Sequence, residues 1–294
     1  MIVVTTPTGN IGSQVLKGLL SSKEPIRVIA RDPDRLPPEA RKRVEVVVGS
    51  HGDGGVVTEA FQGAQSVFWL VPPDPRAASV EAAYVDFARP AAKALRQHAV
   101  KQVVGVSALG RGTPWAAHAG LVTASLAMDD LIASSGVSYR ALTMPSFMDN
   151  LLRQVEPITK NGVFSLPIDG DRKLPSAATR DIASAAVRLL LDQSWSGVAS
   201  LPVLGPEDLS YNDMARILSE VLGRPVRFEQ ISNDAFKARL VGRGMSDAMA
   251  QATLDMWIAK NNGIDNAVKR TREGSSPTSF REWANEAFKP RVGA

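Results

Sequence analysis

The residues best suited to chemistry lie within the first dozen positions of the chain. A short apolar run, Ile2–Thr5, breaks into a turn of Thr, Pro, Gly and Asn, and an amphipathic segment follows from Ser13 to Leu20. This pattern predicts a strand, a glycine turn and the start of a helix. A helix N-terminus presents unpaired backbone N–H groups and partial positive charge, and glycine lets an anion approach the backbone. The turn is therefore predicted to bind a dinucleotide pyrophosphate through Thr6, Thr8, Gly9, Asn10, Ile11 and Gly12.

The spacing of this turn departs from the usual dinucleotide fingerprint at one position. It reads Thr-x-x-Gly-x-x-Gly over residues 6–12, so threonine stands where the first glycine is expected. An ordinary turn whose glycines serve packing is the alternative, but the preceding strand and a second strand at Ile26–Ala30 favour nucleotide binding. Because a proline follows Thr6, we expect an extended backbone and a strand one residue longer. Phosphate contacts would then fall on the amides of Asn10 and Ile11.

A basic side chain, Arg31, ends the second strand about nineteen residues after the last glycine of the turn. In such folds the tip of this strand lies beside the adenosine ribose, where an acid binds a 2′-hydroxyl and arginine suits a 2′-phosphate. Arg31 therefore favours NADP(H) as the cofactor. Asp32 leaves NAD(H) open, because a shift of the turn by one residue would present its carboxylate instead. Two surface charges in a plain turn are the remaining interpretation.

Two candidates for moving protons follow later in the chain. Ser107 ends a fifth apolar run, where a side chain either faces the crevice that binds substrates or caps a backbone turn. His118 is the only nearby group that titrates near neutral pH, and it could equally cap a helix or lie on the surface. The Tyr-x-x-x-Lys pair of short-chain dehydrogenases is absent, since the residues four positions after the three tyrosines are Ala88, Thr143 and Ala215.

A scaffold of parallel strands is needed to bring these residues together. Apolar β-like runs occur at Ile2–Thr5, Arg27–Ala30, Val44–Val48, Ser66–Val71, Gln102–Ser107 and Tyr139–Met144. Helical patterns alternate with them, the longest over about 77–98 and another over 121–132. This alternation predicts an α/β fold with a Rossmann-type doubly wound parallel sheet. Val71 and Pro72 begin a proline-rich wall where the ribose next to the nicotinamide would lie, and the glycine-rich loop 49–55 is expected at the adenine.

The last part of the chain has mainly helical patterns. Asp181 is expected to cap a helix over Ile182–Leu191. A second helix starts near Leu209 and ends at Gly223. A final amphipathic helix, packed on this region, is predicted from the spacing of Phe280, Trp283, Ala284 and Phe288.

Length and composition limit the class of protein. The 294 residues have room for a dinucleotide-binding domain at 1–150 and a smaller α+β lobe at 151–294 packed on it. A net charge of +4, with 34 basic residues spread along the chain, argues against a nucleic-acid partner. The absence of cysteine excludes disulfides and thiolate metal sites, and no metal site is predicted. Without a membrane-spanning run or an evident signal peptide, we expect a cytoplasmic monomer or homodimer that acts on a small molecule, without a membrane partner.

Five segments carry longer patterns, and the last two of them are more specific than the glycines. They are Thr-Gly-Asn-Ile-Gly at 8–12, Val-Ile-Ala-Arg-Asp-Pro at 28–33, Met-Pro-Ser-Phe-Met-Asp-Asn at 144–150, and the stretches 179–183 and 204–211. Together they resemble the NmrA-like branch of the atypical short-chain dehydrogenases over nearly the whole chain. The segment at 144–150 is similar to the family signature Arg-Pro-x-x-Phe-Met-x-Asn. This branch includes NAD(P)H quinone and azo-dye reductases, isoflavone-type reductases and catalytically silent redox sensors.

The resemblance implies a Rossmann domain and a smaller C-terminal lobe that closes a substrate cleft between them. It places Pro145, Ser146 and Phe147 beside the nicotinamide, and Asn10, Ile11, Arg31 and Ser107 as cofactor or cleft contacts. The chain departs from the family pattern at three places. Thr6 replaces the first glycine, Met144 replaces the arginine of the signature, and the lysine frequent in the 118–128 region is missing.

Reduction of a quinone-, azo- or enone-like acceptor fits a chain without the Tyr–Lys pair. Such an acceptor takes hydride directly from the nicotinamide while water supplies the protons, so the protein has only to bind, orient and exclude water. We therefore expect an NADPH-dependent oxidoreductase, with NADP(H) preferred and NAD(H) as the alternative. A catalytically silent NADP(H)-binding redox sensor that acts through a protein partner fits the same absence. An epimerase or dehydratase would need a tyrosine or paired acid and base groups that the sequence does not offer.

Overall fold

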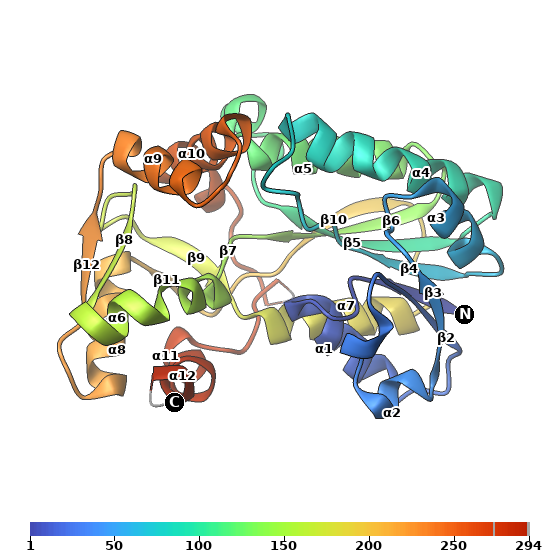
Figure 1. The fold of residues 1–294 in the computed structure, drawn as a ribbon, viewed down its shortest axis with the longest axis horizontal. Helices are drawn as coiled ribbons and strands as arrows, with labels where there is room; N and C mark the ends of the chain where they lie inside the picture. Colours follow the sequence, from blue (N-terminus) through green and yellow to red (C-terminus); the bar gives the residue numbers. More distant parts are fainter. Residues whose placement is uncertain (273, 293–294) are drawn as a thin grey trace. The chain divides into compact units, whose positions relative to one another are not determined.

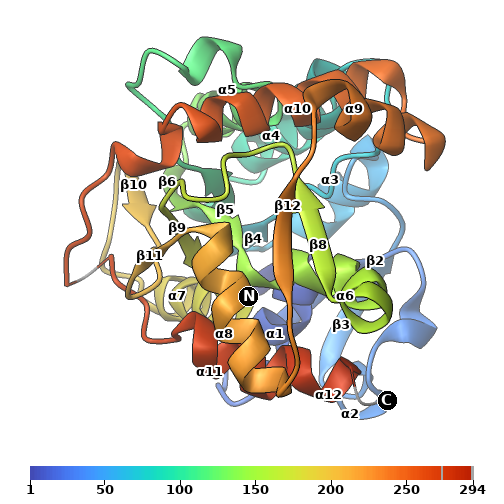
Figure 2. The same ribbon diagram turned by 90° about the vertical axis from the view of Figure 1, so that its left-hand side faces the viewer.

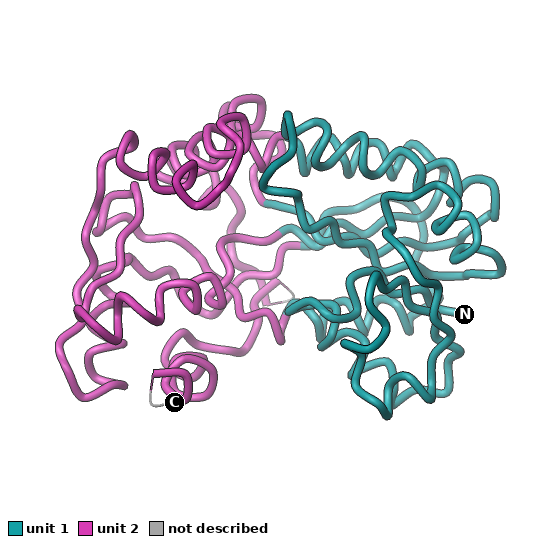
Figure 3. Tube along the Cα trace, viewed as in Figure 1, with its two compact units in different colours: residues 1–108, 124–143, 182–201 teal, residues 109–123, 144–181, 202–294 magenta. Residues whose placement is uncertain are grey.

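The computed structural model describes residues 1–272 and 274–292 (Figure 1, Figure 2), which form two compact units (Figure 3). Unit 1 comprises residues 1–108, 124–143 and 182–201, and unit 2 comprises residues 109–123, 144–181 and 202–294. The chain passes from one unit to the other five times, so the division differs from a single boundary at residue 150. Residues 109–123 belong to unit 2 and residues 182–201 belong to unit 1, so neither unit is one continuous segment.

Unit 1 is built on a seven-stranded parallel sheet with the order β10-β6-β5-β4-β1-β2-β3. Its strands are β1 Ile2–Thr5, β2 Ile26–Ala30, β3 Val44–Val48, β4 Ser66–Trp69, β5 Gln102–Ala108, β6 Ser138–Met144 and β10 Val198–Pro202. Val3 of β1 lies opposite both Arg27 of β2 and Val67 of β4. The strand order therefore reverses between β1 and β4, which creates the switch point where such sheets bind ligands. The predicted doubly wound α/β fold is confirmed.

Helices cover both faces of this sheet (Figure 1). One face carries α3 Gly54–Phe61, α4 Phe87–Gln97 and α5 Leu121–Ala133, and the other carries α1 Asn10–Leu19 and α7 Thr179–Leu191, while the short α2 Pro38–Arg41 precedes β3. A Cβ on Gly18 of α1 would come within 2.8 Å of Val187 of α7, so this glycine permits close packing of the two helices. The helix predicted over 77–98 begins later than expected, at Val80, and continues into a π-helical turn at Ala82–Asp86. The Asp74 side chain and carbonyl hold the preceding segment in a turn.

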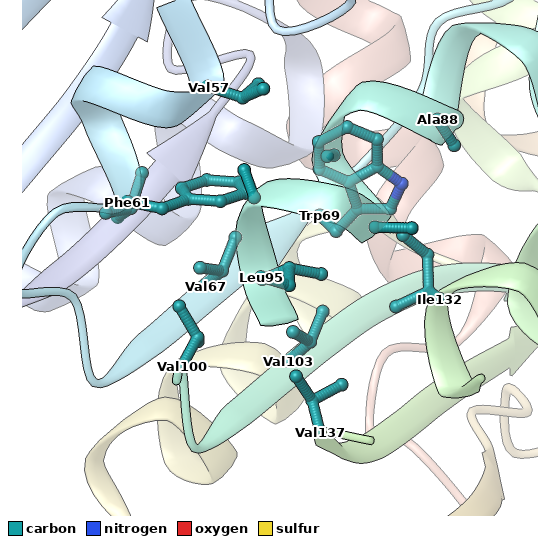
Figure 4. Close-up of a cluster of buried hydrophobic side chains, with 14 of the residues drawn as sticks. Val57, Phe61, Val67, Trp69, Ala88, Leu95, Val100, Val103, Ile132 and Val137 are labelled. Carbon is teal, nitrogen blue, oxygen red and sulfur yellow. The ribbon is translucent and has the colours of Figure 1, made fainter. Parts of the chain in front are cut away.

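The core of unit 1 fills the space between the sheet and helices α3, α4 and α5 (Figure 4). Val57 and Phe61 of α3 and Val67 and Trp69 of β4 have no exposed surface. All four residues of β4 are buried, which explains why this strand is a continuous apolar run in the sequence. Each fully buried side chain of this size stabilises the fold by roughly 1.5–3 kcal/mol relative to its exposed form. The strand nevertheless ends at Trp69, two residues before the predicted end, where the proline-rich segment begins.

Unit 2 combines two small sheets with several helices. In the first sheet, β9 Leu174–Ala177 pairs antiparallel with β11 Asp208–Leu209 and parallel with β7 Ser146–Phe147. In the second, β8 Val163–Leu166 runs parallel to β12 Arg227–Gln230 (Figure 2). The helices are α6 Val155–Asn161, α8 Tyr211–Leu222, α9 Asn233–Gly242, α10 Asp247–Asn261, α11 Phe280–Trp283 and α12 Lys289–Val292. None of the helices within the described ranges combines the length and apolar character required to cross a bilayer.

Two predicted helices of unit 2 form as expected. Ser210 caps α8 by accepting a hydrogen bond from the Asp213 amide, and the Asp213 carboxylate accepts one from the Ser210 amide in return. The helix ends at Gly223, which has a left-handed backbone with φ +66°. The last helical segment includes a π-helical stretch between α11 and α12, and its predicted apolar side chains lie buried in the core of unit 2: Phe280, Trp283, Ala284 and Phe288.

The start of α7 differs from the prediction. The helix begins at Thr179, so the prediction that Asp181 caps it is wrong. Instead, the buried Asp181 carboxylate accepts hydrogen bonds from the amide and hydroxyl of Thr278, at 3.0 and 2.8 Å. Asp149 takes the capping role, because its carboxylate accepts from the Thr179 amide at 3.1 Å and from the hydroxyl at 2.9 Å. The prediction chose the acidic residue nearest in sequence to the start of the helix. The carboxylate that caps the helix instead belongs to a residue thirty positions away.

Candidate functional site

The turn between β1 and α1 has a different backbone from the one predicted. Thr6 is left-handed, with φ +51°, and β1 ends at Thr5, so the expected extension of the strand is wrong. The reason is the closure of the turn: the Thr6 carbonyl accepts a hydrogen bond from the Gly9 amide at 3.0 Å. A Cβ on Gly12 would lie 2.1 Å from the same oxygen, so glycine is required there. Thr6 thus adopts a conformation that glycine adopts without strain.

The N-terminus of α1 is open to an anion. Gly9 is its N-cap, no side chain caps it, and the first turn of the helix contains no acidic residue. The first amides of a helix have no intrahelical acceptor, so the N–H groups of Asn10, Ile11 and Gly12 are available to a ligand. Asn10 is exposed and Thr8 is half-buried, whereas Ile11 and Gly12 are buried and anchor the end of the helix. The donors at this turn suit a pyrophosphate.

The neighbouring strand end is tied to this turn. The Thr5 hydroxyl donates to the Phe68 carbonyl at 3.0 Å and accepts from the Leu70 amide at 3.1 Å. These bonds join the ends of β1 and β4 at the switch point of the sheet. Val71 and Pro72 follow directly, the first buried and the second exposed, in a segment without helix or strand. The predicted wall therefore lies just beyond the end of β4, on the same edge as the turn.

Arg31 and Asp32 follow β2 and differ in how their charges are used. The Asp32 carboxylate accepts a hydrogen bond from the Asp34 amide at 3.1 Å and caps a 3₁₀ turn at Pro33–Arg35. Arg31 is exposed, and its guanidinium has no hydrogen bond or ion pair with any residue that the structure describes. The Asp32 carboxylate therefore already has a hydrogen-bond partner in the local turn, and the Arg31 guanidinium remains available to an anionic ligand.

His51 lies in the loop after β3 and has a structural role. Its Nε2 is 3.0 Å from the Leu70 carbonyl oxygen, and its ring packs edge-on against Trp69 and Phe87. Burial lowers the pKa of His51 to about 4, the positive charge of Arg31 lowers it further, and the hydrogen bond to Leu70 partly opposes both. His51 is consequently neutral at pH 7 and donates its Nε2 proton to the carbonyl.

Ser107 belongs to a buried group of three polar side chains. Its hydroxyl donates a hydrogen bond to the Asp129 carboxylate, and the Tyr139 hydroxyl donates to the other carboxylate oxygen at 2.6 Å. All three residues are buried. A Cβ on Gly105 would lie 2.1 Å from the Tyr139 hydroxyl, so glycine in β5 makes room for the phenol. The Ser107 proton is thus engaged inside unit 1, and the serine can offer only lone pairs to a ligand.

Sequence reasoning did not identify Asp129 and Tyr139 as partners of Ser107. Both belong to elements that follow β5 in the chain, α5 and β6, and only the fold brings them to the serine. Two signals in the sequence point to them. Asp129 lies within a mainly apolar helix, and Gly105 interrupts an apolar strand where a bulky neighbour needs space.

His118 is the other predicted proton donor. It ends a short 3₁₀ turn at Ala116–His118 in unit 2, whereas Ser107 belongs to unit 1. Its side chain is exposed and makes no hydrogen bond within the described part of the chain. The structure thus gives His118 none of the partners that orient a catalytic histidine.

The predicted nicotinamide-flanking segment lines a pocket of unit 2. Pro145 is buried, and Ser146 and Phe147 form β7, with Ser146 opposite Ser176 of β9. The pocket has about 50 Å³ of free space, and its lining includes Ser146, Phe147, Met148, Tyr211, Met214 and Trp257. Aromatic and Met side chains with a few polar groups are typical of a site for a small, flat molecule.

Tyr211 supplies a phenol to this pocket. It begins α8, lies 7% exposed, and its ring stacks on Phe228 with centroids 5.2 Å apart. Burial raises the pKa of Tyr211 well above its usual range, the negative charge of Asp265 raises it further, and the nearby Ser146 hydroxyl opposes the shift. The phenol therefore keeps its proton.

Comparison with known proteins gives consistent matches. Residues 7–194 match a family model described as NAD(P)H-binding. The chain is 32% identical, over 99% of its length and 100% of the relative, to (4-alkanoyl-5-oxo-2,5-dihydrofuran-3-yl)methyl phosphate reductase of Streptomyces griseus. It is 28% identical to an NAD(P)H azoreductase of Xenophilus azovorans, over 87% of this chain and 86% of the relative. The structure of triphenylmethane reductase from Citrobacter sp. complexed with NADP(H) is similar, with a TM-score of 0.81 and 22% identity over 98% of this chain and 100% of that chain.

Proposed function

Because this chain belongs to the NAD(P)H-binding, NmrA-like family of atypical short-chain dehydrogenases, we propose that it is an NADPH-dependent reductase of small conjugated acceptors. Its relatives are NAD(P)H-dependent reductases, one of which carries a dihydrofuranone in its name and another an azo group. We assign quinone-, azo- or enone-like compounds as acceptors. These compounds accept hydride without a strong acid, which fits the absence of a Tyr–Lys pair.

The observation that carries the proposal is the uncapped N-terminus of α1 at the switch point, with a free guanidinium at the next strand end. The amides of Asn10, Ile11 and Gly12 would hold the pyrophosphate. Arg31 would pair with a 2′-phosphate, since Asp32 already caps its own turn and cannot serve the ribose hydroxyls without breaking that cap. NADPH is therefore the proposed coenzyme, ahead of NADH.

The remaining residues of the site bind and orient rather than transfer protons. When bound, the reduced nicotinamide supplies the hydride. Asp129 fixes the Ser107 hydroxyl, so that Ser107 presents lone pairs to a hydrogen-bond donor of the ligand. Val71 is buried just after β4. Pro72 has no backbone N–H, so it offers no backbone hydrogen-bond donor to a ligand. Water supplies the proton that completes reduction.

The proposal is tested by following the absorbance of NADPH with purified protein and a panel of quinones, azo dyes and enones. We expect oxidation of NADPH above background with at least one class of acceptor. Gly12→Ala is the control variant, because its Cβ would displace the Thr6 carbonyl and open the turn. It should lose activity with every acceptor alike. Tight binding of NADPH with no turnover of any acceptor would refute the reductase and favour a redox sensor.

A further inference from the structure

A cavity of about 610 Å³ lies where three neighbouring strands of unit 1 begin. Its lining includes Lys101 just before β5, Val137 and Ser138 at the start of β6, and Ser196 shortly before β10. Every residue that lines it belongs to unit 1. Ligand pockets typically measure about 300–1,000 Å³, so the cavity has the size for a small organic molecule.

The cavity and the turn between β1 and α1 lie at opposite edges of the sheet. The turn follows the carboxyl end of β1, whereas the cavity adjoins the amino ends of β5, β6 and β10. All strands of this sheet are parallel, so their amino ends share one edge and their carboxyl ends share the other. A ligand could therefore bind in the cavity whether or not unit 1 holds a dinucleotide.

The described residues that line the cavity include two cationic side chains and no acidic one. Arg96, in the last turn of α4, donates from Nη2 to the Ser134 carbonyl at 2.7 Å and from Nε to the Ser135 carbonyl at 3.4 Å. These neutral partners orient the guanidinium without cancelling its charge. Lys101 is exposed, and its ammonium has no hydrogen bond or ion pair within the described ranges. The uncompensated positive charge favours an anionic ligand.

Trp195 adds an aromatic surface to the cavity. Its Nε1–H donates to the Leu189 carbonyl at 2.9 Å, which fixes the orientation of the indole. The guanidinium of Arg140 lies over the ring, 4.5 Å from its centre, and Arg140 does not line the cavity. A planar group in the cavity would therefore meet the part of the indole that Arg140 does not cover. Stacking on a ring that is already held in place needs little further ordering.

The loop that contains Trp195 is anchored to the start of β6. The Arg140 guanidinium donates to the Ser196 carbonyl at 2.9 Å and to the Gly197 carbonyl at 2.8 Å. The Ser138 hydroxyl accepts a hydrogen bond from the Gly197 amide at 3.2 Å. These bonds hold the indole near the cationic side chains before any ligand arrives.

We propose that this cavity is a second binding site of unit 1, for a planar aromatic anion such as an aromatic carboxylate or sulfonate. The ring stacks on Trp195, and the anionic group pairs with Arg96 and Lys101. Apolar contact comes from lining residues of the unit 1 core, among them Leu95 and Val100 (Figure 4). An inorganic anion would gain no stacking and a neutral arene no ion pair, so the site selects a molecule that has both parts.

The first measurement locates the ligand by nitrogen–proton NMR of the tryptophan indoles in the full-length protein. The chain has five tryptophans, and Trp195→Leu identifies the Trp195 signal by its loss. On titration with 2-naphthoate we expect this signal to shift most, with a Kd on the order of 1 mM or lower for a ligand of this size. The neutral 2-naphthamide has nearly the same shape and should bind roughly threefold to tenfold more weakly, because it forms no ion pair.

The second measurement reverses the charge at Lys101. Lys101→Glu should weaken 2-naphthoate binding about tenfold and change 2-naphthamide binding far less, because only the anion loses an ionic partner. Lys23→Glu is the matched control, since Lys23 is also exposed but precedes β2, three strands away from β5. It changes the net charge equally and should alter either Kd by less than about twofold, because salt screens distant charges.

Three results would overturn this site. They are equal affinity for 2-naphthoate and 2-naphthamide, shifts confined to tryptophans other than Trp195, and equal effects of Lys101→Glu and Lys23→Glu. The titration is repeated with NADPH at saturation, where we expect the same Kd for 2-naphthoate. Competition with NADPH would place the anion at the dinucleotide site instead and would also overturn the proposal. None of these measurements follows turnover of an acceptor, so the reductase is tested separately.

Discussion

Thr6 combines a left-handed backbone with a buried hydroxyl oxygen that has no partner in the described part of the chain. A left-handed β-branched residue costs about 1–2 kcal/mol, and the proline after it adds to the strain. Strain of this kind persists only where neighbouring contacts impose it, here the bond from the Gly9 amide and the contact with Gly12.

Thr6→Gly should therefore stabilise the protein. We expect a gain of about 1 kcal/mol in the free energy of unfolding, because relief of strain exceeds the entropy that glycine adds to the unfolded chain. Chemical denaturation measures the change. Thr6→Ala, which removes the hydroxyl but keeps a Cβ, should recover less. A destabilised glycine variant would show that Thr6 is not strained.

The coenzyme preference should depend on Arg31. Arg31→Asp is expected to raise the Kd for NADPH by roughly 10-fold to 100-fold, the worth of one charge-assisted pair, and to change the Kd for NADH far less. Arg35→Asp is the matched control, since Arg35 is also exposed and lies in the same turn. Isothermal titration with both coenzymes gives the comparison. Equal losses for NADPH and NADH would refute the assignment of Arg31 to the 2′-phosphate.

His51 predicts a pH dependence of stability. Its pKa is about 4 in the folded protein against 6.5 in the unfolded chain. The unfolded state therefore binds the proton first, and the stability contributed by neutral His51 is complete above pH 6.5 and is lost as the pH falls towards 4. The loss amounts to about 3 kcal/mol for a shift of this size. In His51→Gln, the free energy of unfolding should depend less on pH over this interval. Replacement of the exposed His118 by Gln should leave that dependence unchanged.

At the scale of elements, the capping of α7 joins two segments of unit 2 that carry family motifs. Asp149 belongs to the 144–150 segment, and its carboxylate accepts hydrogen bonds from the amide and hydroxyl of Thr179. Asp149→Ala should cost about 1–2 kcal/mol of stability, the usual worth of a helix cap. Asp149→Asn should retain most of it. Thermal unfolding of both variants is the measurement, and an unaffected alanine variant would remove Asp149 as the cap.

Six of the seven strands of unit 1 could be predicted from sequence because each is a short apolar run with turn residues on both sides. The seventh, β10, was not predicted, because none of its residues is buried and it has no apolar run. β1 and β3 have the predicted bounds, and β5 and β6 differ by one residue. The predictions that failed depend on contacts between distant segments. The backbone conformation of Thr6 is set by the hydrogen bond that closes its turn rather than by the following proline. Helix α7 is capped by Asp149 rather than by Asp181.

The residues of the candidate site also differ in whether the sequence alone reveals them. The residues of the glycine turn and Arg31 are visible in the sequence because a single βα unit supplies them. The partners of Ser107 come from separate elements, and no local pattern relates Ser146 to Tyr211, which lines the same pocket. Contacts of this kind become visible only when the sheets and helices are in place.

At the scale of the whole molecule, the two units have separate cores but share one interleaved chain. A fragment of residues 1–150 lacks residues 182–201, which supply most of α7 and β10 to unit 1. We expect this fragment to lack a stable fold and to bind NADPH at least about tenfold more weakly than the full chain. Circular dichroism and coenzyme titration test this, and a folded fragment with full affinity would contradict it.

The five tryptophans are divided between the units, with Trp69 in the core of unit 1 and Trp257 against the ring of Tyr211 in unit 2. Intrinsic fluorescence consequently contains contributions from both units. Variants that keep only one of these indoles would show whether the units melt together or in succession. The emission of Trp257 would also register an acceptor entering its pocket without an added dye or label.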